Sequence, residues 1–575
     1  MEEENQKLDP VLGLSLELTP EERSISPQLE AGFEPDTETW EVIVKYQGNL
    51  KQYESPGFCV EELIAGYGIV TLKEERLPFL LGLQEVEYVE MPKPLYENDE
   101  LGREAACITP VTEGSPFLTG AGVLVAIPDS SIDVSNMHFR KEDGTTRIIE
   151  LWDQNIQPGQ MSSDISPACP MLGRIYTEAE INEMIDDFPV KDISGHGTAV
   201  AGILAAGCKD GYCGVAPECS LLIIKLRQNK RAGYSDSGDI MRGVTYALNC
   251  ARKYNMPLVI NLSYGTVSGS HRGNSLLERF LDNASEIGKT TIVVGSGNEG
   301  SSGRHASGRL MSGRTEVLEM TVGEYDFGFS VQIFTLGTER IRVSIRSPLG
   351  EIYRLPSDSG NYFYTLLQER LYSFVSSPRP YTTYREMFIG IYPEAGFVTP
   401  GIWTLILEPV KIVTGEYEIY LSENVSGNED LRFLLPTPEL TVTIPATSEK
   451  VISVGAYSVF DNAYAPFSGR GFAGGNNGSG VKPDIVAPGV GIRTVSAGGG
   501  YTVVSGTSFA APFVSGSAAL LMEWGILRGY DPFFYGERMK SYLRQGAKTF
   551  PGFGVLPNDK VGFGALCLLN SFSDS

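Results

Sequence analysis

Short apolar runs alternate with segments of helical periodicity in two stretches of the chain. The apolar runs cover residues 123–127, 221–226, 258–262, 290–294 and 451–454. Residues 239–253 and 274–287, between these runs, have apolar positions at helical spacing. Continuous apolar strands that alternate with helices favour a parallel sheet covered on both faces. In such a sheet, functional side chains gather at the carboxyl ends of the strands.

Residues 320–425 follow a different pattern. Apolar and polar residues alternate strictly over 340–346 and 416–421, and 401–407 is another β-rich run. Helical periodicity is scarce here, which is typical of an antiparallel β-sandwich. We therefore predict an α/β domain made of residues 100–318 and 435–575, interrupted by an inserted sandwich over 319–434.

The N-terminal hundred residues divide into two parts. Residues 39–99 predict a small α+β domain, with strands near 40–46, 68–72 and 86–91 and two short helices. Residues 1–38 are acidic and lack periodicity, so we expect a flexible extension. The first residues contain no basic region that leads into an apolar one, so we expect no secretory signal peptide.

Composition narrows the range of partners. The chain of 575 residues has 46 Lys and Arg against 71 Asp and Glu, a formal net charge of −25. Such a chain repels phosphate backbones and anionic lipids, so we expect neither nucleic acid nor a membrane surface as a partner. No apolar run is long enough to span a membrane. We expect the eight cysteines to be reduced and mostly buried, and we expect no zinc, because no C-x-x-C pair occurs.

Two residues stand in sequence contexts that favour chemistry. His196, one of four histidines, lies between Gly195 and Gly197 at the start of a predicted helix. Ser508 follows Gly506-Thr507 and precedes a long apolar helix, so its N–H and Oγ lie at the positive end of that helix. Taken singly, each is as well explained by helix capping.

Two further residues follow predicted strands. Asp129 follows the run 123–127, and a carboxylate at the end of a strand can accept the Nδ1–H of a histidine. Asn298 follows the run 290–294, where its amide can donate to a developing oxyanion. A solvated loop aspartate and a turn asparagine are the ordinary alternatives.

Together these residues stand in motifs that resemble those of the subtilisin-like serine proteases. The matching segments are Val125-Ala126-Ile127-Pro128-Asp129-Ser130-Ser131-Ile132-Asp133, Gly195-His196-Gly197-Thr198, Gly297-Asn298-Glu299-Gly300, Gly506-Thr507-Ser508-Phe509-Ala510-Ala511-Pro512 and Pro483-Asp484-Ile485-Val486-Ala487-Pro488-Gly489, and Asn261-Leu262-Ser263-Tyr264-Gly265 looks like the family's substrate-binding edge. The chain order Asp, His, Ser is also that of the family.

The resemblance implies a serine endopeptidase with Asp129, His196 and Ser508 as catalytic residues and Asn298 in the oxyanion hole. It implies that a protein or peptide substrate binds along a set of residues after the strands: Ser263, Tyr264, Gly265, Gly233, Gly295 and Gly297. Residues 39–99 would then be a propeptide that binds the catalytic cleft and is removed by self-cleavage within 96–100. We expect no cofactor and carry over no metal site.

Two positions depart from the family pattern. Ser131 stands where the family usually has glycine, and a serine there would be strained if the site needs positive φ. Ala199 stands where a second histidine is usual. Neither change removes a reacting group.

The retained prodomain and the sandwich inserted before the serine resemble the Csp proteases of clostridial spores. Segments 147–154 and 176–182 also look like that group. This resemblance implies activation of a cortex-lytic zymogen during germination, with cytoplasmic synthesis and packaging in spore layers. The alternative is a catalytically silent binding or signalling protein on the same scaffold, and the complete triad argues against it.

Overall fold

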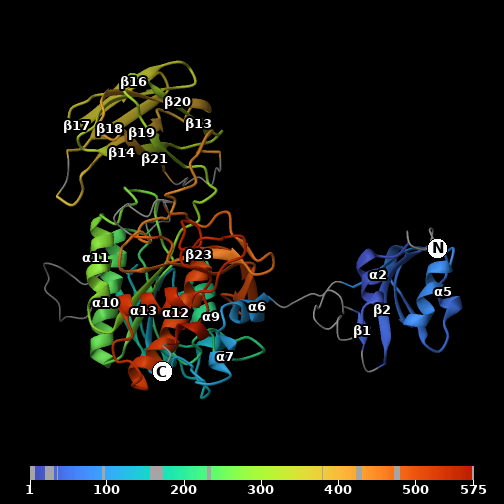
Figure 1. The fold of residues 1–575 in the computed structure, drawn as a ribbon. Helices are drawn as coiled ribbons and strands as arrows, with labels where there is room; N and C mark the ends of the chain where they lie inside the picture. The colour runs from blue at the N-terminus through green and yellow to red at the C-terminus, as the bar shows by residue number, and fades with distance from the viewer. Residues whose placement is uncertain are drawn as a thin grey trace. The chain divides into compact units, whose positions relative to one another are not determined.

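The computed structural model describes residues 7–19, 32–34, 37–92, 98–155, 173–228, 235–377, 380–422, 430–471 and 480–572. The chain divides into two compact units, Met1–Glu97 and Asn98–Ser575, and Figure 1 gives the ribbon of each. The units are described separately below.

The N-terminal unit is a five-stranded antiparallel sheet with short helices. Its order is β1 (Phe33–Glu34), β2 (Thr39–Tyr46), β4 (Tyr67–Lys73) and β3 (Phe58–Glu62), and β5 (Val86–Glu90) pairs with β2. The α-helices are α2 (Pro10–Glu17) and α5 (Leu77–Gly82), and 3₁₀ turns cover Lys51–Tyr53, Ile64–Gly66 and Glu74–Arg76. Alternate residues of β2, such as Trp40, Val42 and Val44, fill the core.

The prediction of a flexible extension over 1–38 is wrong for the segment that forms helix α2. Helix α2 lies within it, and Leu12 of that helix is fully buried in the core of the unit. The Asp9 N–H donates to the Val89 carbonyl of β5 at 2.9 Å. Leu12 and Leu16 lie one turn apart in α2 and Leu8 lies just before the helix, and all three pack in this core, an apolar pattern that the acidic composition conceals.

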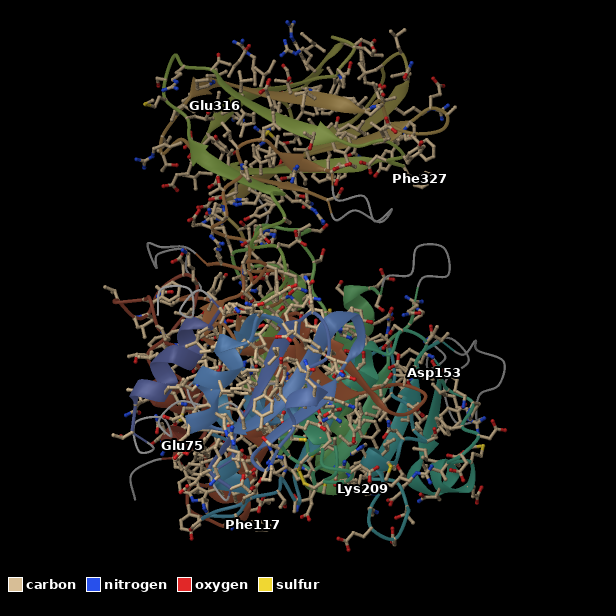
Figure 2. The ribbon with its side chains drawn as sticks, turned by 90° about the vertical axis from the view of Figure 1, so that its right-hand side faces the viewer. Glu75, Phe117, Asp153, Lys209, Glu316 and Phe327 are labelled. Carbon is tan, nitrogen blue, oxygen red and sulfur yellow. A yellow bond between two sulfur atoms is a disulfide. The ribbon has the colours of Figure 1, made fainter. Side chains whose placement is uncertain are left out.

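The second unit is built on a mainly parallel nine-stranded sheet. Its order is β24 (Ala463–Tyr464), β23 (Ile452–Ser458), β11 (Thr290–Gly295), β10 (Leu258–Leu262), β6 (Leu124–Asp129), β9 (Ser220–Lys225), β7 (Ile148–Asp153) and β8 (Arg174–Thr177), and β25 (Ile485–Val490) pairs with β23. Only β8 and β24 pair antiparallel within this sheet. Its strand ends include Asp153, labelled in Figure 2.

Helices cover both faces of this sheet, as predicted. One core contains Val125 together with residues of α9 (His196–Ala205), α12 (Thr507–Met522) and α13 (Gly536–Gly546). The other contains the next residue, Ala126, with residues of α10 (Ser237–Tyr254) and α11 (Leu276–Ser285). Shorter elements are α6 (Asn98–Ala105), α7 (Thr109–Thr112), α8 (Glu178–Glu183), the 3₁₀ turns Met137–Phe139 and Leu569–Ser571, and the ribbon of β26 (Ile492–Val495) and β27 (Tyr501–Val504).

Two antiparallel sheets form the inserted domain, on which Figure 2 labels Glu316 and Phe327. One sheet has the order β12 (His305–Arg309), β21 (Glu416–Leu421), β14 (Phe329–Leu336), β19 (Tyr384–Pro393), β18 (Glu369–Val375) and β17 (Gly360–Thr365). The other has the order β16 (Ile352–Leu355), β15 (Arg340–Arg346), β20 (Gly401–Lys411), β13 (Glu316–Val322) and β22 (Arg432–Phe433). A shared apolar core joins them, which confirms the predicted fold class. The first strand, β12, begins before the predicted boundary at 319.

The cysteines differ from the prediction of reduced thiols. Cys107 bonds to Cys567 and Cys208 to Cys213, while Cys219 and Cys250 are free and buried. The first pair is separated by 460 positions, a distance at which sequence spacing gives no pairing signal. Among the described helices, Thr507–Leu527 is long and apolar enough to cross a membrane, but 89% of its apolar window is buried inside the protein.

Candidate active site

Asp129 and His196 meet at the carboxyl end of β6. Asp129 ends this strand and is fully buried. Its Oδ1 accepts from His196 Nδ1 at 2.7 Å and from the Ser130 N–H at 2.7 Å. The carboxylate therefore holds the imidazole in the tautomer that carries its proton on Nδ1.

His196 is the first residue of α9, after Gly195, whose φ of 73° lets the chain turn into the helix. Burial lowers the pKa of His196, but the charge and hydrogen bond of Asp129, with a smaller contribution from Asp192, outweigh it and raise the pKa above its usual value of 6.5. The imidazole is held for proton transfer and carries a higher proton affinity than a free histidine.

Asp192 stabilises the turn that carries His196, and the sequence reasoning missed it. Its Oδ1 accepts from the Gly195 N–H at 3.0 Å and its Oδ2 from the Thr198 N–H at 2.9 Å. Ser130 Oγ also donates to Asp192 Oδ1, at 2.8 Å. A buried aspartate four residues before the histidine is the signal that could have revealed it, because such a side chain caps a helix N-terminus.

Ser508 lies in the same neighbourhood, as the second residue of α12. The ring of the next residue, Phe509, lies 5.4 Å from the His196 ring, and the Tyr264 ring lies 6.1 Å from it. Ser508 Oγ donates to the Ser263 carbonyl at 3.3 Å, and Ser263 Oγ donates to the Ser508 carbonyl at 3.0 Å. Within the described contacts the hydroxyl is therefore bonded to the end of β10 rather than to the imidazole.

Asn298 lies beside the start of α12. Its Oδ1 accepts from the Thr507 N–H at 3.0 Å and from Thr507 Oγ1 at 3.2 Å. Its Nδ2 lies 3.5 Å from the point that a Cβ on Gly506 would occupy. Because the amide oxygen is engaged by Thr507, the amide N–H₂ is the part that can donate to another group near the N-terminus of α12.

The predicted substrate-binding residues follow two neighbouring strands. Ser263, Tyr264 and Gly265 come directly after β10, while Gly295 ends β11 and Gly297 follows with a φ of 88°. The predicted residue Gly233 lies outside the described residues, as do residues 96 and 97 of the predicted cleavage segment; Asn98 begins α6.

Thr443 lies between these two strand ends, and no motif pointed to it. A Cβ added to Gly265 or to Gly297 would collide with its side chain. The Thr443 N–H donates to the Ser296 carbonyl at 2.9 Å, which fixes the residue against the loop that leads to Asn298. Thr443 therefore packs against both glycines.

The backbone at Ser131 is strained, as expected for a serine at a position where the family usually has glycine. Its φ is 110°, a conformation that side chains other than glycine rarely adopt. The residue follows the Asp129–Ser130 pair, so strained backbone is held directly beside the catalytic candidates.

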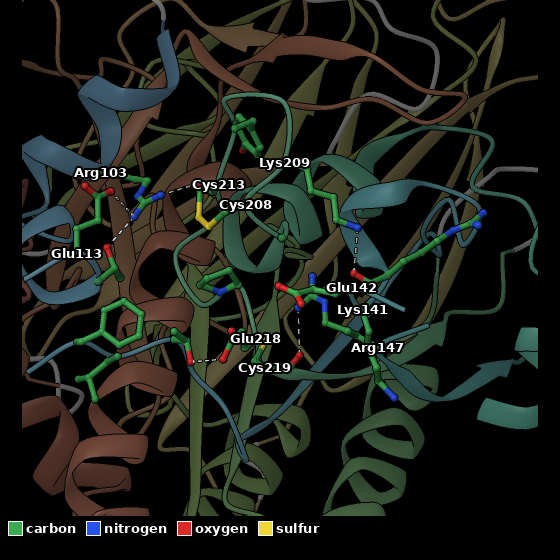
Figure 3. A pocket seen from close by; sticks show the side chains of 18 of the residues that line it. Arg103, Glu113, Lys141, Glu142, Arg147, Cys208, Lys209, Cys213, Glu218 and Cys219 are labelled. Atoms are coloured by element: carbon green, nitrogen blue, oxygen red, sulfur yellow. Dashed lines mark hydrogen bonds and ion pairs between the residues drawn. A yellow bond between two sulfur atoms is a disulfide. The ribbon is translucent and has the colours of Figure 1, made fainter. Parts of the chain in front are cut away.

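A separate pocket of about 1010 Å³ is lined by Arg103, Arg147, Glu218 and the Cys208–Cys213 disulfide, among others (Figure 3). In Figure 3, Arg103 Nη1 donates to the Cys213 carbonyl, at 3.3 Å. The described residues that line it do not include the candidate catalytic residues.

Comparison with known families gives two matches. Residues 6–93 match the Csp protease B prodomain, and residues 120–349 and 426–564 match the subtilase family. The gap between the last two segments falls inside the inserted sandwich.

Comparison with individual proteins agrees with this. The solved structure of the Clostridium perfringens CspB protease is similar with a TM-score of 0.75 and 34% identity, over 82% of this chain and 96% of that one. The PIII-type proteinase of Lactococcus lactis subsp. cremoris is 25% identical over 85% of this chain and 26% of its own length. The chain thus spans about a quarter of that relative's length. The human membrane-bound transcription factor site-1 protease is 35% identical over 136 residues, 23% of this chain and 12% of its own.

Proposed function

The chain belongs to the subtilase family, and from this membership we propose that it is a serine endopeptidase with a triad of Asp129, His196 and Ser508. The observation that carries the proposal is the 2.7 Å hydrogen bond between the buried Asp129 carboxylate and His196 Nδ1. The His196 ring also packs against Phe509, the neighbour of the nucleophile.

The chemistry follows from these roles. Ser508 Oγ attacks the scissile carbonyl while His196 Nε2 takes its proton, and the carbonyl π electrons move to the oxygen. Collapse of the tetrahedral intermediate breaks the C–N bond, and His196 returns the proton to the leaving amine. Water then repeats the sequence on the acyl-enzyme and frees Ser508.

Two donors stabilise the oxyanion in this scheme. They are the Asn298 amide N–H₂, whose oxygen is fixed by Thr507, and the Ser508 backbone N–H at the start of α12. Donors that are already oriented act in the transition state without reorganisation.

The substrate lies extended along Ser263–Gly265, as an added strand. The side chain before the scissile bond (P1) enters the space between Gly265 and Gly297, and Thr443 is its floor. The collisions that a Cβ would make with Thr443 support this assignment.

The prodomain is the chain's own partner in this proposal. It binds the catalytic cleft, and self-cleavage within 96–100 separates it from the protease. The match to the Csp protease B prodomain supports this step.

The narrower role is activation of a cortex-lytic zymogen in spore germination, by a protein packaged in spore layers. The likeness to CspB over 82% of the chain supports it. Incubation with such a zymogen should give one new N-terminus with the wild type and none with Ser508→Ala.

A catalytically silent scaffold protein is the second candidate. One observation favours it: the hydrogen bond of Ser508 Oγ goes to Ser263 and not to His196. Rotation about the Cα–Cβ bond moves a serine hydroxyl between staggered positions, and in the proposed endopeptidase such a rotation turns Ser508 Oγ from Ser263 to His196.

Intact mass and labelling with a fluorophosphonate distinguish the two candidates. The wild type should be processed within 96–100 and gain one phosphonyl adduct, whereas Ser508→Ala should stay full length and unlabelled. Ser505→Ala is the matched control, because Ser505 is an exposed serine nearby that accepts from the Gly491 N–H. An unlabelled wild type would overturn the endopeptidase and favour the silent scaffold.

A further inference from the structure

Three aromatic rings stack where the inserted sandwich joins the α/β domain. His271 lies in the loop after β10, while His305 of β12 and Tyr420 of β21 are directly opposite each other on neighbouring strands of one sheet of the sandwich. The His271 and Tyr420 rings lie 4.0 Å apart with an interplanar angle of 14°, and Tyr420 and His305 lie 4.5 Å apart at 23°. All three residues are at most 3% exposed, and two of the chain's four histidines are in this stack.

Each ring bonds to a different carbonyl of one backbone segment. His305 Nδ1 lies 3.0 Å from the Thr437 carbonyl, the Tyr420 hydroxyl donates to the Leu440 carbonyl at 3.1 Å, and His271 Nδ1 lies 2.6 Å from the Val442 carbonyl. Residues 437–442 are the segment through which the chain returns from the sandwich to Thr443. We call it the return segment.

Charged groups hold the stack in place from the side. His305 Nε2 lies 3.0 Å from Glu418 Oε2, and Arg272 pairs with the other oxygen of Glu418 at 3.4 Å. Glu418 and Arg272 are almost buried, with side chains 10% and 8% exposed. The sandwich and the His271 loop are therefore tied to each other independently of the return segment.

His271 makes the bond nearest to the candidate substrate pocket. Burial lowers the pKa of His271, while its bonds to the Val442 and Val267 carbonyls act in the opposite direction. Its nitrogens face two carbonyls, Val442 at 2.6 Å and Val267 at 2.9 Å. The shorter contact assigns the proton to Nδ1 and the bond to Val442.

The return segment ends at the pocket floor. Thr443 follows Val442, bonds to Ser296 through its N–H, and packs against both Gly265 and Gly297. A shift of the Val442 carbonyl would move Thr443 relative to these glycine walls, because one peptide unit joins them.

We infer that the His271–Tyr420–His305 stack is a positioning device through which the inserted sandwich sets the P1 specificity of the protease, by fixing the return segment and with it Thr443. This rests on the proposed function. None of the three residues touches the reacting atoms, so the stack governs which side chain is accepted and leaves the reactivity of Ser508 unchanged.

The test compares His271→Ala with His271→Asn. Asparagine carries its amide nitrogen on Cγ, as histidine carries Nδ1, and it tolerates the left-handed backbone at φ 53°. His138→Asn is the matched control, because His138 is also buried and its Nδ1 lies 2.9 Å from a carbonyl, that of Gly207.

Peptides that differ only in P1, with alanine, leucine or phenylalanine, give the readout. His271→Ala should change the ratio of kcat/KM between the phenylalanine and alanine peptides by about tenfold or more, mainly through KM. His271→Asn should restore the wild-type ratio, and His138→Asn should leave it unchanged. The rate of fluorophosphonate labelling should stay within about twofold in all of them, since the probe needs no P1 fit.

Three results would overturn the inference: an unchanged ratio in labelled His271→Ala, an equal loss on all peptides, or the same change in His138→Asn. A wild type that is not labelled would instead contradict the proposed function. If His271→Ala does not fold, Tyr420→Phe decides, because it removes only the bond to the Leu440 carbonyl. It should shift the ratio in the same direction, and an unchanged ratio there would also refute the inference.

Discussion

Replacing Asp484 by asparagine should destabilise the α/β domain more than any surface change. Asp484 is fully buried just before β25 and accepts from the Ser453 N–H at 2.7 Å. Its carboxylate also contacts Lys482 at 3.1 Å, Lys540 at 3.2 Å and the Arg544 guanidinium. One carboxylate thus lies among three basic side chains, of which those of Lys482 and Lys540 are buried and that of Arg544 is 25% exposed.

The expected loss follows from the charges that remain. Removing one partner of a buried ion pair costs about 3–5 kcal/mol, because the other charge stays buried. Burial has already lowered the pKa of Lys482 to about 7, even though Asp484 raises it. Near pH 8 Lys482 is therefore largely neutral with or without Asp484, and the charges left without their anion are those of Lys540 and Arg544. We therefore expect the lower end of the range, about 3 kcal/mol.

Urea unfolding at pH 8, followed by tryptophan fluorescence, measures this loss. The Ser508→Ala background prevents self-digestion. Asp186→Asn is the control, because the Asp186 side chain is 84% exposed and pairs with Arg140; its effect should stay within about 0.5 kcal/mol. A loss below about 1 kcal/mol for Asp484→Asn would refute the reasoning, since the cations beside Asp484 would then need no anion.

The pH dependence provides a second check on the same residue. The three cations hold the pKa of Asp484 below its ordinary value despite its burial. A depressed pKa contributes stability above the unfolded value, about 3.9, which is lost as the pH falls through the folded value. The gap in unfolding free energy between wild type and Asp484→Asn should therefore narrow as the pH falls below about 4.

Three further predictions concern catalysis. Asn298→Ala should lower kcat by roughly 100- to 1,000-fold with little change in KM, and a loss confined to KM in peptide assays would contradict its oxyanion role. The pKa of His196 is raised above 6.5, and the imidazole must be neutral to act as a base. In a pH profile, kcat/KM should therefore fall toward acidic pH with a midpoint above 6.5. A midpoint below 6.5 would argue against the influence of Asp129. Thr443→Gly should raise kcat/KM for phenylalanine over alanine at P1 by roughly tenfold or more, and a peptide series with unchanged preference would exclude Thr443 as the floor.

The sheet and its helices could be predicted because parallel strands are buried on both faces. Val125 and Ala126 enter different cores, so the strand reads as a continuous apolar run. The start of the sandwich could not be found this way. Strand β12 has the sequence HASGR, which does not alternate, and it is a strand because β21 pairs with it from more than a hundred positions away.

The candidate site was predictable to the extent that its residues carry local motifs. Asp129, His196, Asn298 and Ser508 each lie at or after the end of a strand or at the start of a helix, and glycine lies directly beside His196 and Asn298. The bond of Ser508 to Ser263 could not be predicted, because it depends on a rotamer and not on residue type. The Ser263 carbonyl, which accepts this bond, and the His196 imidazole, which is the alternative partner, lie in segments that are brought together only when the sheet folds.

The inserted sandwich is part of the site in a way that its position in the sequence does not suggest. The chain leaves the α/β domain a few residues after Asn298 and returns at Thr443, so both ends of the insertion border the pocket walls. Joining 304 directly to 437 would keep every triad residue and would remove His305 and Tyr420, and with them two of the three rings that hold the return segment. Such a deletion should therefore alter P1 selectivity more than it alters the reactivity of Ser508. If the sandwich served only as an appended binding module, the deletion would leave the P1 selectivity on short peptides unchanged.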